Sequence, residues 1–134
     1  MGVVRIAAIQ MGATDDIGHN LDRALDLVDA ATESWGRIDA ICLPEYCFGL
    51  PQGTTAGWRS PSRKSQILDA MSEKAARHQV NIITGSFPEP AGDGRYYNTT
   101  LVIDRQGNLI GHYRKTHLFD AMDAAESKRV APGD

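Results

Sequence analysis

The chain has 134 residues, of which 42% are hydrophobic and 23% charged, and its formal net charge is −3. These values are typical of a single globular domain with a modest core. The acidic balance, with a pI of about 5.7, argues against a nucleic-acid backbone as partner. No apolar run reaches the ~18 residues of a membrane span, and no signal peptide is recognisable. We therefore expect a cytoplasmic protein that binds neither nucleic acid nor membrane.

The first half of the sequence alternates strand-like and helix-like patterns. Residues 3–10 form a short apolar run typical of a buried strand. A helix should follow, ending near Gly36, because one helical face collects Leu21, Ala24, Leu25, Val28 and Ala31. A second strand is predicted over residues 39–45 and a third over residues 80–87. The helix between them has the apolar stripe Ile67, Leu68, Met71 and Ala75.

The second half changes to an antiparallel pattern. Residues 96–104 and 109–113 are strand-like runs, joined by the turn-forming residues 105–108. The expected fold is therefore α/β, with the order β-α-β-α-β followed by an antiparallel hairpin in a mixed sheet and with helices on one side. From Asp120 onward the chain is polar, and it closes in a turn at residues 132–134.

Two short segments carry candidate chemistry. In CLPEYCF, Glu45 follows Pro44 at the carboxyl end of the second strand, which is where sites gather in open α/β sheets. The alternative is a solvated glutamate that opens a loop. Residues 112–117, with the sequence HYRKTH, end the hairpin and are either functional or a solvated basic rim.

The predicted loop over residues 46–63 is long enough to suggest a binding role. Phe48, Trp58 and Arg59 are candidates for a pocket wall. Arg59 or Arg63 could receive a substrate carboxylate through two parallel hydrogen bonds, although either arginine could equally be solvated.

Four motifs in order resemble one family: GVVRIAAIQM, DAICLPEYCFG, IITGSFPEP and YYNTTLVIDRQGNLIGHYRKTHLFD. They are similar to the amino-terminal portion of the carbon-nitrogen hydrolases, the nitrilase superfamily. The resemblance implies the amino-terminal part of an αββα sandwich, with residues 1–134 as a single partial domain. It implies Glu45 as the general base and Lys115 as the catalytic lysine, with no metal or organic cofactor. It also implies a homo-oligomer, a dimer or higher.

The family's third catalytic group is a cysteine that lies a few dozen residues beyond the lysine, so the resemblance places it outside this chain. Cys42 and Cys47 do not stand at the nucleophile's position. Cys47 is close to Glu45 in sequence, but a buried or pocket-wall thiol is the favoured interpretation, and Cys42 is expected in the core. A zinc site made from these cysteines with His112 and His117 would have ligand spacings that match no usual pattern.

Two functional hypotheses remain. The first is a hydrolase of amide, carbamoyl or nitrile carbon-nitrogen bonds in its complete form, with the 134-residue chain alone inactive. The second is a non-catalytic remnant or an interaction module on the same scaffold. Glu45 and Lys115 in their motifs favour the first. In either case, the sheet surface that a missing portion would cover should be apolar and exposed.

Overall fold

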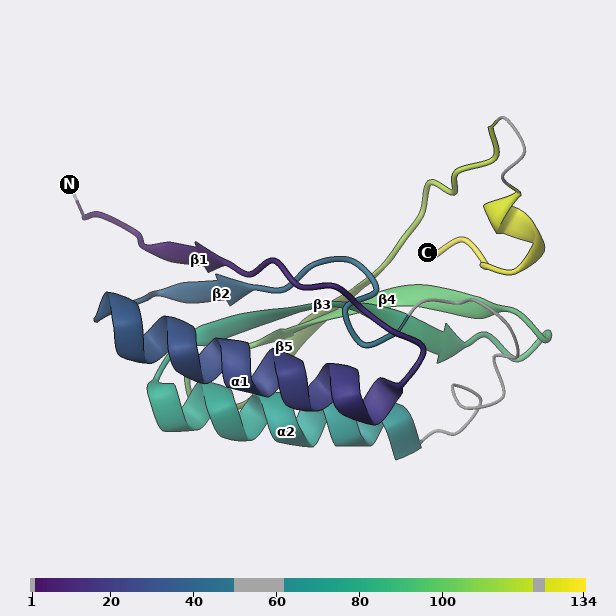
Figure 1. Cartoon of the computed structure of the whole chain (residues 1–134). Coiled ribbons are helices and arrows are strands. Elements are labelled where there is room, and N and C mark those ends of the chain that lie inside the picture. The colour runs from purple at the N-terminus through teal and green to yellow at the C-terminus, as the bar shows by residue number, and fades with distance from the viewer. Residues whose placement is uncertain (1, 50–61, 122–124) are drawn as a thin grey trace.

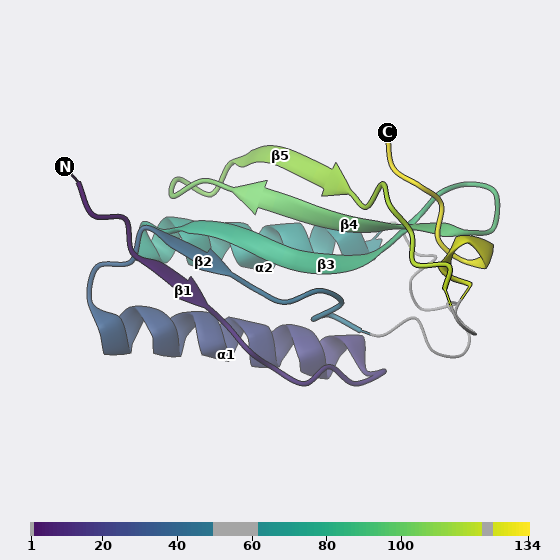
Figure 2. The same cartoon turned by 90° about the horizontal axis from the view of Figure 1, so that it is seen from above.

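The computed structural model describes residues 2–49, 62–121 and 125–134. They form one five-stranded sheet in the order β1-β2-β3-β4-β5, with two long helices on one of its faces (Figures 1 and 2). The strands are β1 (Ile6–Ala8), β2 (Ala40–Cys42), β3 (Asn81–Pro90), β4 (Tyr96–Ile103) and β5 (Leu109–Arg114). The helices are α1 (Ile17–Trp35), α2 (Ser62–His78) and the short 3-10 helix η2 (Glu126–Lys128). In these described ranges no helix is long and apolar enough to cross a membrane.

The pairing of the strands confirms the mixed sheet. β1, β2 and β3 are parallel, whereas β3, β4 and β5 are antiparallel neighbours. The parallel pairs follow from the two helical crossovers, and the antiparallel pairs follow from the short turns. Asp104 closes the β4–β5 turn, because its carboxylate accepts hydrogen bonds from the backbone N–H groups of Gln106 and Asn108.

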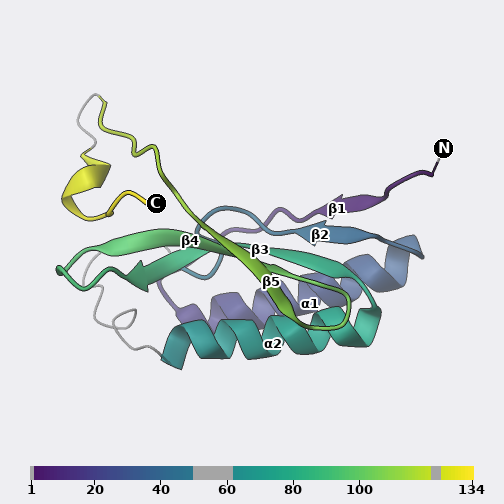
Figure 3. The ribbon, with the colours of Figure 1, turned by 180° about the vertical axis from the view of Figure 1, so that it is seen from behind.

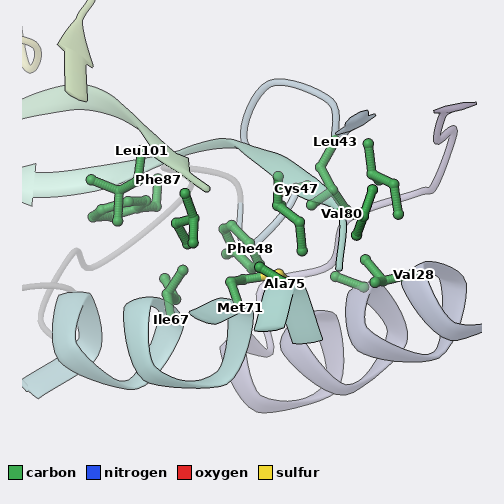
Figure 4. Close-up of a cluster of buried hydrophobic side chains, with 14 of the residues drawn as sticks. Val28, Leu43, Cys47, Phe48, Ile67, Met71, Ala75, Val80, Phe87 and Leu101 are labelled. Carbon is green, nitrogen blue, oxygen red and sulfur yellow. The ribbon is translucent and has the colours of Figure 1, made fainter. Parts of the chain in front are cut away.

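The main core lies between the sheet and the two helices (Figure 4). Both predicted helical stripes face it: Ala24 and Val28 of α1 are fully buried, as are Met71 and Ala75 of α2. The α1 stripe begins after the N-cap Asp16, whose side chain accepts from the His19 N–H, and the helix ends at Gly36. Phe48 and Phe87 contact each other edge to face with ring centroids 6.5 Å apart and fill the centre of this layer.

The first predicted strand differs from the structure in length and burial. β1 pairs only with β2 in the described part of the chain, and Val3, Val4 and Ile6 are 76%, 71% and 62% exposed. Residues 3–10 were expected to be buried, and that expectation is wrong because the outer edge of β1 has no neighbouring strand among the described residues. β2 is likewise shorter than the expected residues 39–45, since Pro44 has no N–H to donate to a ladder.

The last residues are more ordered than their polar sequence indicates. Glu126–Lys128 forms η2, and Val130 and Ala131 are buried. Tyr96 and Val130 form a parallel bridge at the start of β4, so the carboxy-terminal segment lies beside the sheet end that also carries the end of β5 (Figure 3). The sequence analysis described this segment only as polar and did not predict its helical turn or its buried residues.

Candidate functional site

Glu45 lies in the turn that follows β2, at the carboxyl end of the parallel strands. Leu43 still donates to Ile83 O at 3.0 Å, and the chain then leaves the sheet at Pro44. Tyr46 adopts a positive φ of 54°, and its N–H donates to Ser86 Oγ at 2.9 Å. A non-glycine residue in this conformation is strained and persists where the surroundings hold it. The strained residue next to Glu45 turns the chain back toward β3.

A β-bulge in β3 makes room for this turn. The β3–β4 register shifts between Ile83 and Ser86, and Gly85 within the shift has a φ of 68°. A Cβ at Gly85 would lie 2.2 Å from Pro44 O and 2.9 Å from Cys47 Sγ. The turn that carries Glu45 therefore packs directly on a backbone position that only glycine fits.

Lys115 follows the last residue of β5. Its N–H donates to Asn98 O at 2.9 Å and extends the β4–β5 ladder by one residue. Its carbonyl accepts from the N–H of Gly133 at 2.9 Å, so the carboxy-terminal segment holds the same residue from the other side. Two backbone hydrogen bonds thus hold the Lys115 main chain in place, independently of the contacts that its side chain makes.

The side chains of Glu45 and Lys115 meet although they are far apart in the sequence. Lys115 Nζ lies 3.4 Å from Glu45 Oε1, and Asn98 Nδ2 donates to the same oxygen at 2.6 Å. The Glu45 side chain is 57% exposed and that of Lys115 is 28% exposed. Both line an open pocket of about 360 Å³, whose walls are Leu43, Glu45, Ile83, Gly85, Ser86, Asn98, Thr100, Tyr113 and Lys115.

Glu126 is a third charged group of this cluster and was missed by the sequence interpretation. Both of its carboxylate oxygens lie 3.1 Å from Lys115 Nζ, and Oε2 also accepts from the Phe119 N–H at 2.6 Å. It comes from η2, in the segment that the sequence indicated only as polar. The sequence shows that Glu126 follows Lys115 by about a dozen residues. Nothing in the local pattern indicated that the chain returns toward Lys115 and brings this carboxylate to its ammonium.

The electrostatics keep the lysine charged. Partial burial disfavours the Lys115 ammonium, but the hydrogen bond to Glu126 and the nearby charge of Glu45 outweigh it and raise the pKa of Lys115 above its ordinary value. Lys115 is therefore an ammonium between two carboxylates at neutral pH. Such a group can stabilise negative charge that develops on a reacting oxygen.

Two tyrosines lie close enough to the cluster for its carboxylates to influence them. Burial is the main cause that raises the pKa of Tyr46, and the neighbouring Tyr96, Glu126 and Glu45 raise it further. Burial also raises the pKa of Tyr96, which shares a hydrogen bond with Tyr46. Both hydroxyls therefore remain protonated and can act only as neutral hydrogen-bonding groups.

Comparison with known proteins identifies the family. The family model described as Carbon-nitrogen hydrolase matches residues 5–134. The chain belongs to the carbon-nitrogen hydrolase family. Among its relatives, "Omega-amidase NIT2" of Mus musculus is 36% identical over 143 residues, which cover 100% of this chain and 49% of the relative. "Omega-amidase NIT3" of Saccharomyces cerevisiae is 28% identical, over 98% of this chain and 49% of the relative.

Solved structures support the same family. The crystal structure of Saccharomyces cerevisiae Nit3, a member of the nitrilase superfamily, superposes with a TM-score of 0.80 at 27% identity and covers 98% of this chain and 49% of that one. The carbon-nitrogen hydrolase of Helicobacter pylori G27 has the same fold, with a TM-score of 0.84 at 20% identity over 98% of this chain and 45% of that one. The chain spans about half the length of the carbon-nitrogen hydrolases that it matches.

Cys47 has the properties of an unreactive, buried thiol. It is 1% exposed, its Sγ donates to Thr84 O at 3.2 Å, and burial raises its pKa to about 12. The expectation of a buried thiol is confirmed for Cys47, while Cys42 is only half-buried. Among residues 2–49, 62–121 and 125–134, no group of three or more His, Cys, Asp or Glu could hold a metal ion.

The expected pocket wall is partly wrong. Phe48 is fully buried in the core layer and does not line the pocket beside Glu45. Its aromatic ring packs on Phe87 because the turn after Glu45 points inward over the bulge. Trp58 and Arg59 lie outside the described residues, as does the side chain of Arg63.

Proposed function

We propose that this chain is the amino-terminal part of an enzyme that hydrolyses non-peptide carbon-nitrogen bonds, with Glu45 as general base and Lys115 as the fixed cation. The observation that carries the proposal is the 3.4 Å approach of Lys115 Nζ to Glu45 Oε1 beside an open pocket. Amides are the favoured substrates, because relatives that match the whole chain are named omega-amidases. A dicarboxylate ω-amide is the first candidate among them.

The third group of the mechanism is a cysteine thiol, supplied by the part of the family domain that this chain does not span. Glu45 takes the thiol proton as sulfur attacks the amide carbon, and the Lys115 ammonium stabilises the oxyanion of the tetrahedral state. The C–N bond then breaks, and ammonia leaves with the proton that Glu45 held. Glu45 next takes a proton from water, which hydrolyses the thioester to the acid and restores the thiol.

Glu126 supports this role by holding the Lys115 ammonium through a second, closer carboxylate contact. The ammonium is at 3.1 Å from both Glu126 oxygens, whereas its contact with Glu45 is longer. Glu45 therefore keeps an oxygen available to exchange protons while the lysine remains in place. The proposed complete protein is a cytoplasmic homo-oligomer that needs no metal or organic cofactor.

The first experiment is the intact mass of the protein as its source produces it. A mass well above 14.6 kDa is expected, because the family relatives are about twice as long. A mass equal to that of this chain would favour the alternative, an interaction module or non-catalytic remnant, and no hydrolysis would then be expected.

The second experiment measures hydrolysis of a dicarboxylate ω-amide, an aliphatic amide and a nitrile by that protein and its variants. We expect Glu45→Gln and Lys115→Met each to lower turnover by at least ~100-fold, the usual scale of a lost general base or oxyanion donor, with the fold unchanged. Glu73→Gln and Arg77→Met, at exposed residues of α2 that do not line the pocket, are the matched controls. Wild-type turnover in Glu45→Gln would remove Glu45 from the mechanism.

A further inference from the structure

Asn98 contacts both residues of the proposed mechanism. Its side-chain Nδ2 donates to Glu45 Oε1 at 2.6 Å, and its backbone oxygen accepts from the Lys115 N–H at 2.9 Å. It lies in β4, between the bulged β3 and β5, the strand that Lys115 directly follows. One residue of a central strand is therefore joined to Glu45 by its side chain and to Lys115 by its backbone.

The orientation of the Asn98 amide follows from chemistry. An ionised carboxylate only accepts hydrogen bonds, so the amide nitrogen must face Glu45 and the amide oxygen must point elsewhere. The side chain is almost fully buried, and Asn98 Oδ1 has no hydrogen-bond partner among the described residues. A buried carbonyl oxygen without a partner is costly and calls for an explanation.

A second buried amide shows what a structural asparagine looks like in this fold. Asn20 is 1% exposed, its Oδ1 accepts from the Thr14 N–H at 2.9 Å, and its Nδ2 donates to Thr14 O at 2.8 Å. Both ends of the Asn20 amide are therefore paired within the fold. Among the described residues, the Asn98 amide has a partner only at the end that faces Glu45, so its place is explained by the carboxylate rather than by packing.

Glu45 needs such a partner because little else holds its side chain. It lies in a turn and is more than half exposed, and its contact with Lys115 at 3.4 Å is long. Holding a flexible glutamate in one geometry costs rotamer entropy, so contacts must offset that cost. The geometry matters because a misplacement of about 1 Å in a reacting group can lower the rate by ~100-fold. The Asn98 hydrogen bond at 2.6 Å is shorter than the Lys115 contact and restrains this side chain directly.

We propose that Asn98 is a positioning residue that holds Glu45 in register with Lys115. This inference rests on the proposed function and deepens it. Asn98 touches no reacting atom in this scheme and acts through the carboxylate. Its backbone bond to Lys115 persists in any substitution, so a side-chain variant isolates the contact with Glu45.

The test compares Asn98→Ala with the matched variant Asn20→Ala in the protein as its source produces it. In amide hydrolysis, we expect Asn98→Ala to lower kcat by about 100-fold with KM nearly unchanged. Asn20→Ala should lower Tm and leave kcat and the pH profile unchanged. Asn98→Asp, which keeps the shape but replaces the donor with an oxygen, should show the same fall in kcat if the alanine variant does not fold. Wild-type kcat in a folded Asn98 variant would overturn the proposal.

A second readout needs no turnover. The charge of Glu45 helps to raise the pKa of Lys115, so Lys115 should titrate at lower pH in Asn98→Ala than in wild type, as followed by NMR of 13C-labelled lysine. Glu45→Gln should lower it similarly, and the double variant should add little. An unchanged Lys115 titration in Asn98→Ala would overturn the proposal. If the wild-type protein hydrolyses none of the substrates, the proposed function fails, while the titration still decides the role of Asn98.

Discussion

Arg114 Nε donates a hydrogen bond of 3.0 Å to Glu89 Oε2 and joins the end of β5 to the end of β3. Lys64 Nζ, near the start of α2, lies 2.6 Å from Glu89 Oε1, and Thr99 Oγ1 donates to Oε2 at 2.8 Å. The Arg114 guanidinium also lies over the ring of Tyr97, 4.2 Å from its centroid. The residue before Lys115 is thus anchored to a buried carboxylate that also receives bonds from a helix and from β4.

Glu89→Gln should destabilise the protein in a pH-dependent way. Burial disfavours the Glu89 carboxylate, but bonds from Arg114, Lys64 and Thr99 outweigh it and lower its pKa from 4.5 to about 2. A lowered carboxyl pKa contributes stability above its ordinary value, and this contribution is lost as the pH falls toward 2. We expect Glu89→Gln to cost about 2–3 kcal/mol near neutral pH, measured by urea unfolding.

The pH series supplies the control for the Glu89 prediction. Between about pH 5 and pH 3, the wild type should lose unfolding free energy faster than Glu89→Gln, because the Glu89 carboxyl binds a proton in the unfolded chain while it stays ionised in the folded protein. Asp93→Asn removes an exposed carboxylate paired with Arg95 and should change stability little. Parallel pH curves for wild type and Glu89→Gln would contradict the prediction.

Gly85→Ala should displace the turn that carries Glu45. The new Cβ would lie 2.2 Å from Pro44 O at a φ of 68°, so the backbone must move. We expect a loss of about 2–4 kcal/mol in unfolding free energy and at least a tenfold loss of turnover. Gly92→Ala also has a positive φ but meets no atom within 4 Å, so it measures the conformational strain alone. Equal effects of the two variants on turnover would show that the close contact at Gly85 does not matter.

Cys47 should resist alkylation in the folded protein. Its thiol is buried, donates to Thr84 O, and has a pKa raised by burial to about 12. Treatment with iodoacetamide near pH 8 should leave Cys47 unmodified until denaturant is added, as read by peptide mass spectrometry. Cys47→Ala should cost roughly 1 kcal/mol of stability and retain turnover, with Cys42→Ala as the control. A folded Cys47→Ala variant without activity would identify this thiol as the nucleophile instead.

Residues 1–134 produced alone should be poorly stable or should aggregate. Val3 and Val4, which precede β1, and Ile6 of β1 are strongly exposed. Ile6 also lines an open pocket of about 530 Å³ together with Ala8, Ile9 and Ile38. On β5, Ile110 is 62% exposed as well. Exposed apolar strand edges template association between chains.

Light scattering and thermal melts test this expectation. Ile6→Lys should reduce aggregation of the 134-residue chain, because a charge on an edge strand opposes pairing, whereas Ser34→Lys on the exposed face of α1 should not. In a longer protein that covers β1, Ile6→Lys should instead lower stability. A sharp, cooperative melt of a 134-residue monomer would contradict the prediction.

The sequence alone determined the order of the elements. Helical stripes such as Ala24–Val28 and Met71–Ala75 must face a core wherever the helix packs, and the 105–108 turn allows only a hairpin. These are local properties of periodicity and turn chemistry, and the family motifs likewise pointed to Glu45 and Lys115 as the candidate residues. The sequence could not indicate how far β1 would be exposed, because burial of a strand depends on neighbours that are distant in the chain.

The tertiary structure alone decided how the site is assembled. Glu45 and Lys115 are 70 residues apart, and their contact depends on the β-bulge at Gly85, the β4–β5 register and the return of the carboxy-terminal segment. Glu126 contacts Lys115 and Asn98 contacts Glu45 because strand pairing and backbone hydrogen bonds place them there. No local sequence pattern indicated either contact. Contacts between segments that are far apart in the chain depend on how all the strands and helices pack together. The local sequence of each segment therefore identifies the candidate groups but not their partners.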